Sequence, residues 1–256
     1  MIVNGMLITL LVEAILAVSL WMMLNRMTHG QAVPKIHKIP GLNAIDEAIG
    51  RATELGRPIH ATPGAGALSD AATFAGLNIL HYVALNCAKY DTKMLTTARM
   101  TAVYPIATAV IRQSYIEAGK PDQFNENDIR FLSEDTWAWA SGVAGLITRE
   151  KVAASIMVGA FWAESLFVAE AGNNVHAIQV AGTASTAQLP FFVAACDYTL
   201  IGEEIFAASA YLSDDPKASA SLIIQDYGKM VIIAIIVIGV ALSSANVNFL
   251  VDLLKL

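Results

Sequence analysis

The apolar positions of this chain form two continuous runs near its ends and shorter periodic stretches between them. The first run, Met6 to Leu24, carries one charge, Glu13, over 19 residues. The second run, Met230 to Val251, carries no charge over 22 residues. A helix rises about 1.5 Å per residue, so each run is long enough to cross about 30 Å of hydrocarbon. The sequence therefore predicts transmembrane helices within residues 1–25 and 229–256.

Two alternatives compete with this topology. A cleaved signal peptide is the alternative for the first run, but no Lys or Arg precedes it and no clear small-x-small cleavage motif follows it. A polytopic protein is the alternative for the whole chain, because Val152–Ala171 and Leu189–Leu212 are also apolar. Both stretches contain acidic residues, each of which costs at least about 2.5 kcal/mol at the centre of a bilayer. We therefore expect a water-soluble segment between two membrane helices.

Basic residues lie on the inner sides of the two terminal runs. Arg26, Lys35 and Lys38 follow the first run, Lys229 precedes the second, and residues 1–25 contain no basic side chain. The positive-inside rule then places the segment from Arg26 to Lys229 in the cytoplasm. The sequence predicts a two-pass protein of the cell membrane with both termini outside.

Between the terminal runs, short β-rich stretches alternate with longer stretches of helical periodicity. Five strands are predicted, at Pro58–Thr62, Lys93–Ala98, Asp128–Ser133, Ser155–Ala160 and Ala177–Gly182. Five helices are predicted, at Leu68–Lys89, Tyr104–Ala118, Thr136–Ile147, Trp162–Ala171 and Gln188–Leu212. Parallel strands need helical crossovers, so this alternation predicts an α/β fold. We expect a Rossmann-like parallel-sheet domain at residues 57–228, inserted between the N-terminal and C-terminal transmembrane helices.

Residues 26–56 are interpreted as a linker followed by an amphipathic helix at Leu42–Leu55. Apolar side chains recur there at helical spacing, which predicts a helix packed on the sheet. A helix lying on the lipid surface is the alternative. Its acidic residues Asp46, Glu47 and Glu54 argue against attraction to anionic headgroups.

Composition and charge narrow the function classes. Hydrophobic residues make up 55% of the chain and charged residues 15%, which is too apolar for an ordinary soluble domain. The net charge is −6, so nothing in the bulk electrostatics suggests a nucleic-acid partner. Cys87 and Cys196 lie among apolar residues and are interpreted as reduced core thiols. The sequence identifies no cofactor and no metal site.

A glycine turn follows the first predicted strand, at Thr62-Pro63-Gly64-Ala65-Gly66-Ala67-Leu68-Ser69-Asp70. Ligands of open parallel sheets bind at the carboxyl ends of the strands, and a turn that opens a helix there suits an anion. Only part of a dinucleotide fingerprint is present, because Ser69 replaces the third glycine and the second strand leads to Arg99 without a ribose-binding acid. A tight turn, with Ser69 or Asp70 capping a helix, is the alternative.

Polar residues also follow the other predicted strands, at the same edge of the sheet. The polar residues of the turn after the fifth predicted strand suit phosphate binding and helix capping equally well. Arg99 either binds a ligand anion or pairs with Glu134. The expected ligand is an anionic small molecule, such as a nucleotide or a phosphorylated metabolite. The candidate ligand-binding residues are Thr62, Gly64, Gly66, Ser69, Arg99, Glu134, Glu164, Thr183, Ser185 and Gln188.

Four acidic residues, Glu13, Asp197, Glu203 and Glu204, are interpreted as making either contacts within a homo-oligomer or structural contacts within the chain. Asp197 and Glu204 are seven residues apart and share one face of the predicted helix Gln188–Leu212, with Glu203 about 100° away. Salt bridges within the domain are the alternative, and no His or carboxylate at i+3 or i+4 from Asp197 supports a metal. Glu13 is costly if it faces lipid, which favours helix association in the membrane.

Two segments resemble a prokaryotic membrane-protein family known only as a domain of unknown function. They are GRPIHATPGAG at Gly56–Gly66, and LPFF, CDYTLIGEE and ASAYLS within Leu189–Ser213. The resemblance covers about Lys38 to Lys229 and implies no activity.

Three functions remain open. The first is a membrane-anchored, self-associating module that binds an anionic ligand, and the second is a homo-oligomeric membrane scaffold without a ligand. The third is a membrane-bound enzyme that uses Glu134, Asp135 or Glu164 as acid or base. The GxSxG, Walker A and HExxH motifs are absent from the sequence, so it lacks the common hydrolase and NTPase signatures.

Overall fold

The structure is a computed structural model that describes residues 13–15, 17–19, 21–22, 25, 40–213 and 216–244. The chain divides into two compact units, one of them His37–Ser213 and the other Met1–Ile36 together with Asp214–Leu256. Three predicted parts of the chain lie wholly or partly outside the described residues. They are the linker before Pro40, most of the first apolar run, and the part of the second apolar run that follows Ser244.

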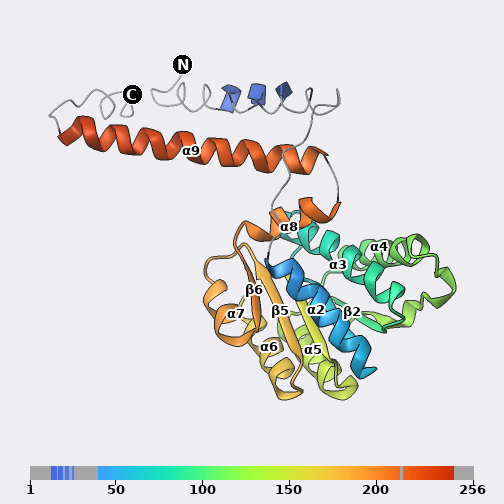
Figure 1. Cartoon of the computed structure of the whole chain (residues 1–256). Coiled ribbons are helices and arrows are strands. Elements are labelled where there is room, and N and C mark those ends of the chain that lie inside the picture. The colour runs from blue at the N-terminus through green and yellow to red at the C-terminus, as the bar shows by residue number, and fades with distance from the viewer. Residues whose placement is uncertain are drawn as a thin grey trace. The chain divides into compact units, whose positions relative to one another are not determined.

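The unit His37–Ser213 is built on a six-stranded sheet in the order β3-β2-β1-β4-β5-β6 (Figure 1). All five strand pairs are parallel, and this is the order of a doubly wound α/β sheet. The predicted α/β fold with a parallel sheet is therefore confirmed. The strands are β1 Ile59–Gly64, β2 Met94–Ala98, β3 Ile129–Phe131, β4 Ala154–Ala160, β5 Ile178–Thr183 and β6 Tyr198–Ile201.

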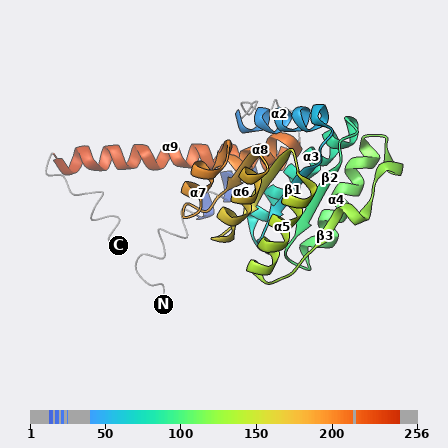
Figure 2. The same ribbon diagram turned by 90° about the horizontal axis from the view of Figure 1, so that it is seen from below.

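Helices cover both faces of this sheet, as parallel crossovers require. Figure 2 shows α2 on one side of the sheet and α5 on the other. One core packs α2, α3, α4 and α8 on the face that contains Ile59 and Ile156, and the second packs α5, α6 and α7 on the face that contains Leu95 and Met157. The helices are α2 Pro40–Leu55, α3 Ala71–Lys89, α4 Val103–Glu117, α5 Thr136–Glu150, α6 Glu164–Asn174, α7 Leu189–Ala195 and α8 Glu204–Ser213, with 3-10 turns η1 Pro121–Gln123 and η2 Glu126–Asp128.

The prediction of one long helix over Gln188–Leu212 is wrong, because β6 interrupts it. Cys196 is extended, and the Tyr198–Ile201 run that follows has the β-branched and aromatic composition of a strand. Gly202 then adopts a left-handed φ of +60°, which ends the strand and starts α8. Pairing with β5 at the sheet edge outweighs the apolar periodicity that favoured a helix.

The amphipathic segment packs on the sheet as predicted. The apolar face of α2 is at most 1% exposed at Leu42, Ile45, Ala48, Ile49 and Ala52. A Cβ at Gly41 would lie 2.4 Å from Leu200 of β6, so the start of α2 lies directly against that strand.

The second unit contains α9, a continuous helix at Pro216–Ser244. Its second half is apolar and exposed, with Ile233 at 60% and Val240 at 63%. Glu13 lies in a helical stretch of the same unit and is exposed. Among the described residues, α3 alone meets the length and hydropathy of a membrane span, and 61% of its most apolar window is buried. We assign α3 to the core of the α/β unit.

Candidate functional site

The structure places the ten predicted ligand residues along one edge of the sheet. They lie at the carboxyl ends of β1, β2, β3, β4 and β5 or in the turns that follow, and parallel pairing brings those ends together. Of the contacts among them, the sequence predicted that between Arg99 and Glu134.

Arg99 ties together the turns that follow β1, β2 and β3. Its Nε donates to the carbonyl oxygen of Ala65 at 2.7 Å. Its Nη1 donates to the carbonyl oxygen of Glu134 at 2.8 Å and to Oγ1 of Thr136 at 3.0 Å. All three acceptors are uncharged, so none of these hydrogen bonds neutralises the charge of the guanidinium. The predicted pairing with Glu134 is therefore made through that residue's main chain.

The Glu134 side chain bonds to the turn after β2. Its carboxylate accepts hydrogen bonds from Oγ1 of Thr101 at 2.5 Å and from the Thr101 backbone N–H at 3.2 Å. These bonds, helped by the nearby charge of Arg99, lower the pKa of Glu134 from its ordinary value. A carboxyl held as the anion in this way accepts hydrogen bonds and is poorly suited to donate a proton as an acid.

The glycines after β1 permit close backbone approach at the centre of the sheet. Gly64 has a left-handed φ of +91°, and a Cβ there would lie 2.5 Å from the carbonyl oxygen of Ala160. The neighbouring Ala65 N–H donates to that same oxygen at 2.8 Å, so a backbone hydrogen bond joins the ends of β1 and β4. A Cβ at Gly66 would lie 2.5 Å from Oγ1 of Thr73. Packing therefore explains both glycines, as in the tight-turn alternative.

Carboxylates of the chain itself bond to backbone N–H groups at this edge, and two of them cap the helices α3 and α5. Asp70 accepts from the Ala72 N–H at 2.9 Å at the start of α3, and Asp135 accepts from the Ala138 N–H at 2.8 Å at the start of α5. Glu164, only 1% exposed, accepts from the Trp162 N–H at 3.0 Å beside the start of α6. These side chains occupy N–H groups that an anionic ligand would otherwise use. Ser69 is exposed, and Asp70 rather than Ser69 caps α3.

The last turn uses its hydroxyl groups locally. Thr183 is buried at the end of β5 and accepts a hydrogen bond from the Ser185 N–H at 3.3 Å. Ser165 in the first turn of α6 donates to Oε1 of Gln188 at 3.5 Å. Neither bond caps α7, whose N-cap residue Gln188 makes no side-chain capping bond.

Two of the four acidic residues, Asp197 and Glu204, accept hydrogen bonds from backbone N–H groups of the edge strands β5 and β6. Asp197 accepts from the Gln179 N–H of β5 at 2.7 Å, and Glu204 accepts from the Ile201 N–H of β6 at 2.8 Å. Their predicted placement on one helical face is wrong, because β6 lies between them. The main-chain carbonyl of Glu203 accepts from Phe206 and Ala207 in the first turn of α8.

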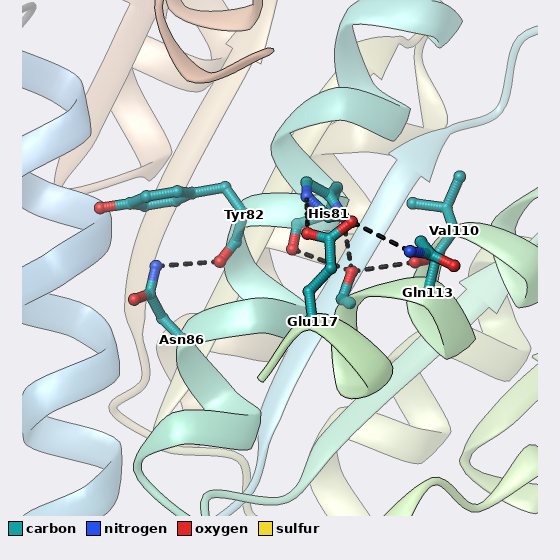
Figure 3. Close-up of polar contacts among 7 residues, drawn as sticks. His81, Tyr82, Asn86, Val110, Gln113 and Glu117 are labelled. Carbon is teal, nitrogen blue, oxygen red and sulfur yellow. Dashed lines mark hydrogen bonds and ion pairs between the residues drawn. The ribbon is translucent and has the colours of Figure 1, made fainter. Parts of the chain in front are cut away.

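A Ser–His–Glu arrangement lies between α3 and α4, away from the strand ends (Figure 3). Nδ1 of His81 lies 2.7 Å from Oγ of Ser114, and Nε2 of His81 lies 3.2 Å from Glu117. Ser114 is fully buried in mid-helix, and its hydroxyl donates to the carbonyl oxygen of Val110 at 2.9 Å. A nucleophile needs access to substrate and a free proton path to its base, and this serine has neither. The arrangement joins two helices.

Sequence reasoning missed a groove between α2 and α3. It has a volume of about 370 Å³ and is lined by Asp46, Ile49, Gly50, Thr53, Tyr82, Asn86 and Tyr90. The available signal was spacing: Tyr82, Asn86 and Tyr90 recur every four residues and so share one face of α3. Within the described residues, no group of three His, Cys, Asp or Glu side chains is arranged to hold a metal.

Comparison with known proteins gives one match. The model of the family described as Domain of unknown function (DUF6754) matches residues 2–254, a longer span than the resemblance noted from the two sequence segments. No curated protein and no solved structure matches the chain.

Proposed function

The chain belongs to this family of unknown function, and we propose that it is a membrane-anchored, self-associating α/β module. The observation that carries the proposal is a set of exposed apolar side chains on α6 and α7. We place the α/β unit in the cytoplasm and both termini outside the cell membrane, following the basic residues beside the terminal runs.

The exposed second half of α9 supports the membrane anchor. Residues 230–244 contain no charged side chain, and large apolar side chains there are more than half exposed, among them Met230, Ile233, Ile236 and Val240. Leaving such a helix in water forfeits about 1.5–3 kcal/mol for each side chain of this size. Lipid covers an apolar helix surface at no such cost.

The face on α6 and α7 is apolar without being part of the core. On α6 and the residues before it, Trp162 is 49% exposed, and Leu166 and Phe167 are each 43% exposed. On the neighbouring α7, Phe191 is 43% and Val193 is 59% exposed. Of the two acidic residues of α6, Glu164 is buried, and Glu170 is exposed one turn beyond Leu166 and Phe167. Exposed aromatic side chains are typical of the centre of a protein interface, and charged side chains such as Glu170 are typical of its rim.

A second copy of the chain is the occupant that this face fits. An interface with twofold symmetry brings the same patch of both subunits together, so the patch must be complementary to itself. Apolar side chains meet that condition, because like apolar surfaces pack against each other without charge repulsion. Anchoring in one membrane also keeps the copies close together, which favours a weak contact.

Phe167→Glu is expected to dissociate the oligomer, because two-fold pairing would bury two unpaired carboxylates. The measurement is the mass of the full-length chain in mild detergent by light scattering during gel filtration. We expect an oligomer for the wild type and at least a tenfold weaker association for the variant. Phe74→Glu is the matched control, since Phe74 is 51% exposed on α3, on the other face of the sheet.

An unchanged mass for Phe167→Glu would contradict self-association through this face. If the variant instead lost affinity for lipid vesicles while its mass stayed the same, the face would be a lipid contact. A dissociation equally produced by Phe74→Glu would show a general loss of folding.

A second candidate function, binding of a small anion at the strand ends, is favoured by Arg99. Its guanidinium has only uncharged acceptors, and Nη2 makes no hydrogen bond to the described residues. This candidate ranks second because Asp70 and Asp135 already cap two helices at this edge, and the Glu164 carboxylate already accepts from the Trp162 N–H. Pyrophosphate should raise the unfolding temperature of the wild type but not of Arg99→Gln, with the exposed Arg112→Gln as control. No shift in the wild type would exclude it.

A further inference from the structure

The turn that joins β1 to α3, residues 65–70, contains three consecutive backbone donors without an acceptor. They are the N–H groups of Gly66, Ala67 and Leu68, for which the described residues supply no partner. Gly66 is buried, and Ala67 and Leu68 are partly exposed. A buried backbone N–H group without a partner is rare in folded proteins. The three donors therefore point to an acceptor that does not come from this part of the chain.

A fourth donor, the hydroxyl of Thr73, faces the same turn. Thr73 lies in the first turn of α3 and is fully buried. Its Oγ1 has no hydrogen-bond partner within the described residues. A Cβ at Gly66 would lie 2.5 Å from this oxygen, so the hydroxyl is directed at the backbone of the turn. A buried hydroxyl without a partner destabilises the fold, and an acceptor bound at the turn would remove that cost.

The charges around the turn have both signs. The guanidinium of Arg99 donates to the carbonyl oxygen of Ala65, directly before the three N–H groups. Two carboxylates lie on the same edge, and both already accept hydrogen bonds, Asp70 as the cap of α3 and Glu134 from Thr101. An anion at the turn is attracted by the guanidinium and by the positive end of the α3 dipole, and is repelled by Asp70.

We propose that the β1–α3 turn, together with Thr73 and Arg99, binds the phosphate group of a small molecule. A phosphate monoester or diphosphate is negatively charged and has several acceptor oxygens in a tetrahedral arrangement. Consecutive backbone N–H groups, a hydroxyl and a guanidinium are the donors that such a group uses in proteins. A carboxylate has two oxygens in one plane and satisfies fewer of them. This inference rests on the second candidate function, anion binding at the strand ends, and specifies its ligand and its donors.

The test uses calorimetry with inorganic pyrophosphate and the full-length chain in mild detergent, at about 0.15 M salt, where long-range attraction is screened. We expect saturable binding of pyrophosphate and no binding of malonate, a dicarboxylate. Dihexanoyl phosphatidic acid, which carries a monoester phosphate, separates two sources of the group. Competition with pyrophosphate supports the site with a lipid headgroup as its ligand, and lack of competition supports it with a soluble phosphate.

Three variants locate the binding. Thr73→Val keeps the shape and removes the hydroxyl, so it should weaken binding by about tenfold and raise the unfolding temperature of the ligand-free chain. Thr96→Val is the matched control, because Oγ1 of Thr96 in β2 is equally buried and has no partner within the described residues. It should raise the unfolding temperature likewise and change binding less than about twofold. Asp70→Asn keeps a capping side chain and removes the repelling charge, so binding should strengthen by about threefold or more.

The outcomes separate this inference from the function on which it rests. Absence of pyrophosphate binding in the wild type would overturn both. Binding that is weakened by Arg99→Gln and unchanged in Thr73→Val would leave anion binding at the edge and overturn its assignment to the turn. Equal weakening by Thr73→Val and Thr96→Val would also overturn that assignment. If Thr73→Val does not fold, as judged by circular dichroism, Asp70→Asn decides, because binding that does not strengthen would place the anion away from the turn.

Discussion

Gly159→Ala is expected to destabilise the α/β unit strongly. Gly159 of β4 has a φ of +152°, and a Cβ there would lie 2.0 Å from the carbonyl oxygen and 2.6 Å from the carbonyl carbon of Pro63. Both are backbone atoms of the neighbouring strand, so no side chain can rotate away. Overpacking of this kind costs about 3 kcal/mol or more, against a total stability on the order of 5–15 kcal/mol.

Urea unfolding followed by tryptophan fluorescence measures this loss. Gly50→Ala is the matched control, since a Cβ there meets nothing within 4 Å in the middle of α2. It should raise stability by about 0.5–1 kcal/mol through helix propensity. A Gly159→Ala variant within about 1 kcal/mol of the wild type would show that β1 and β4 are not in the close contact described.

Acid is expected to destabilise the same unit through His60. This side chain is fully buried in β1, with Nδ1 3.1 Å from Oγ of Ser155 and Nε2 3.0 Å from Oγ1 of Thr97. Burial lowers the pKa of His60 to about 3. The unfolded chain binds a proton on this residue below about pH 6.5, but the folded chain does not until about pH 3. Stability is therefore present above pH 6.5 and is lost as the pH falls from 6.5 toward 3.

The expected loss from His60 at pH 4.5, relative to pH 7, is about 3 kcal/mol. Unfolding by urea at the two pH values should show it in the wild type. His60→Gln, which cannot titrate, should show a smaller difference by about that amount. His176→Asn is the control, because His176 is exposed and its φ of 55° suits asparagine. The same pH dependence in His60→Gln and the wild type would contradict this assignment.

The sequence sufficed to predict the sheet but not its last strand. The five predicted strands are short β-rich runs bounded by turns, and all five are present. β6 was missed because Tyr198–Ile201 lies within a long apolar stretch, and periodicity alone does not separate a short buried strand from a helix. Its pairing with β5 is a long-range contact that no local pattern encodes.

The sequence predicts where the candidate site residues lie on the sheet, but it does not predict their hydrogen-bond partners. Strand order forces the residues after each strand to one edge, so their grouping followed from the fold class. The partners of Arg99 and the capping roles of Asp70 and Asp135 depend on turn geometry. The α2–α3 groove depends on how α2 packs beside α3, and β1 separates these two helices in the sequence. Asp46 was therefore named from the sequence only as an acidic residue of the amphipathic helix, and Tyr82 was not named.

We expect only the terminal unit to need lipid and the α/β unit to fold in water. The most direct test is to express residues 37–213 alone and to centrifuge the lysate at high speed without detergent, beside the full-length chain. We predict that the fragment stays in the supernatant with the circular dichroism of an α/β protein, and that the full-length chain sediments with the membranes. A fragment that sediments unless detergent is added would contradict the account.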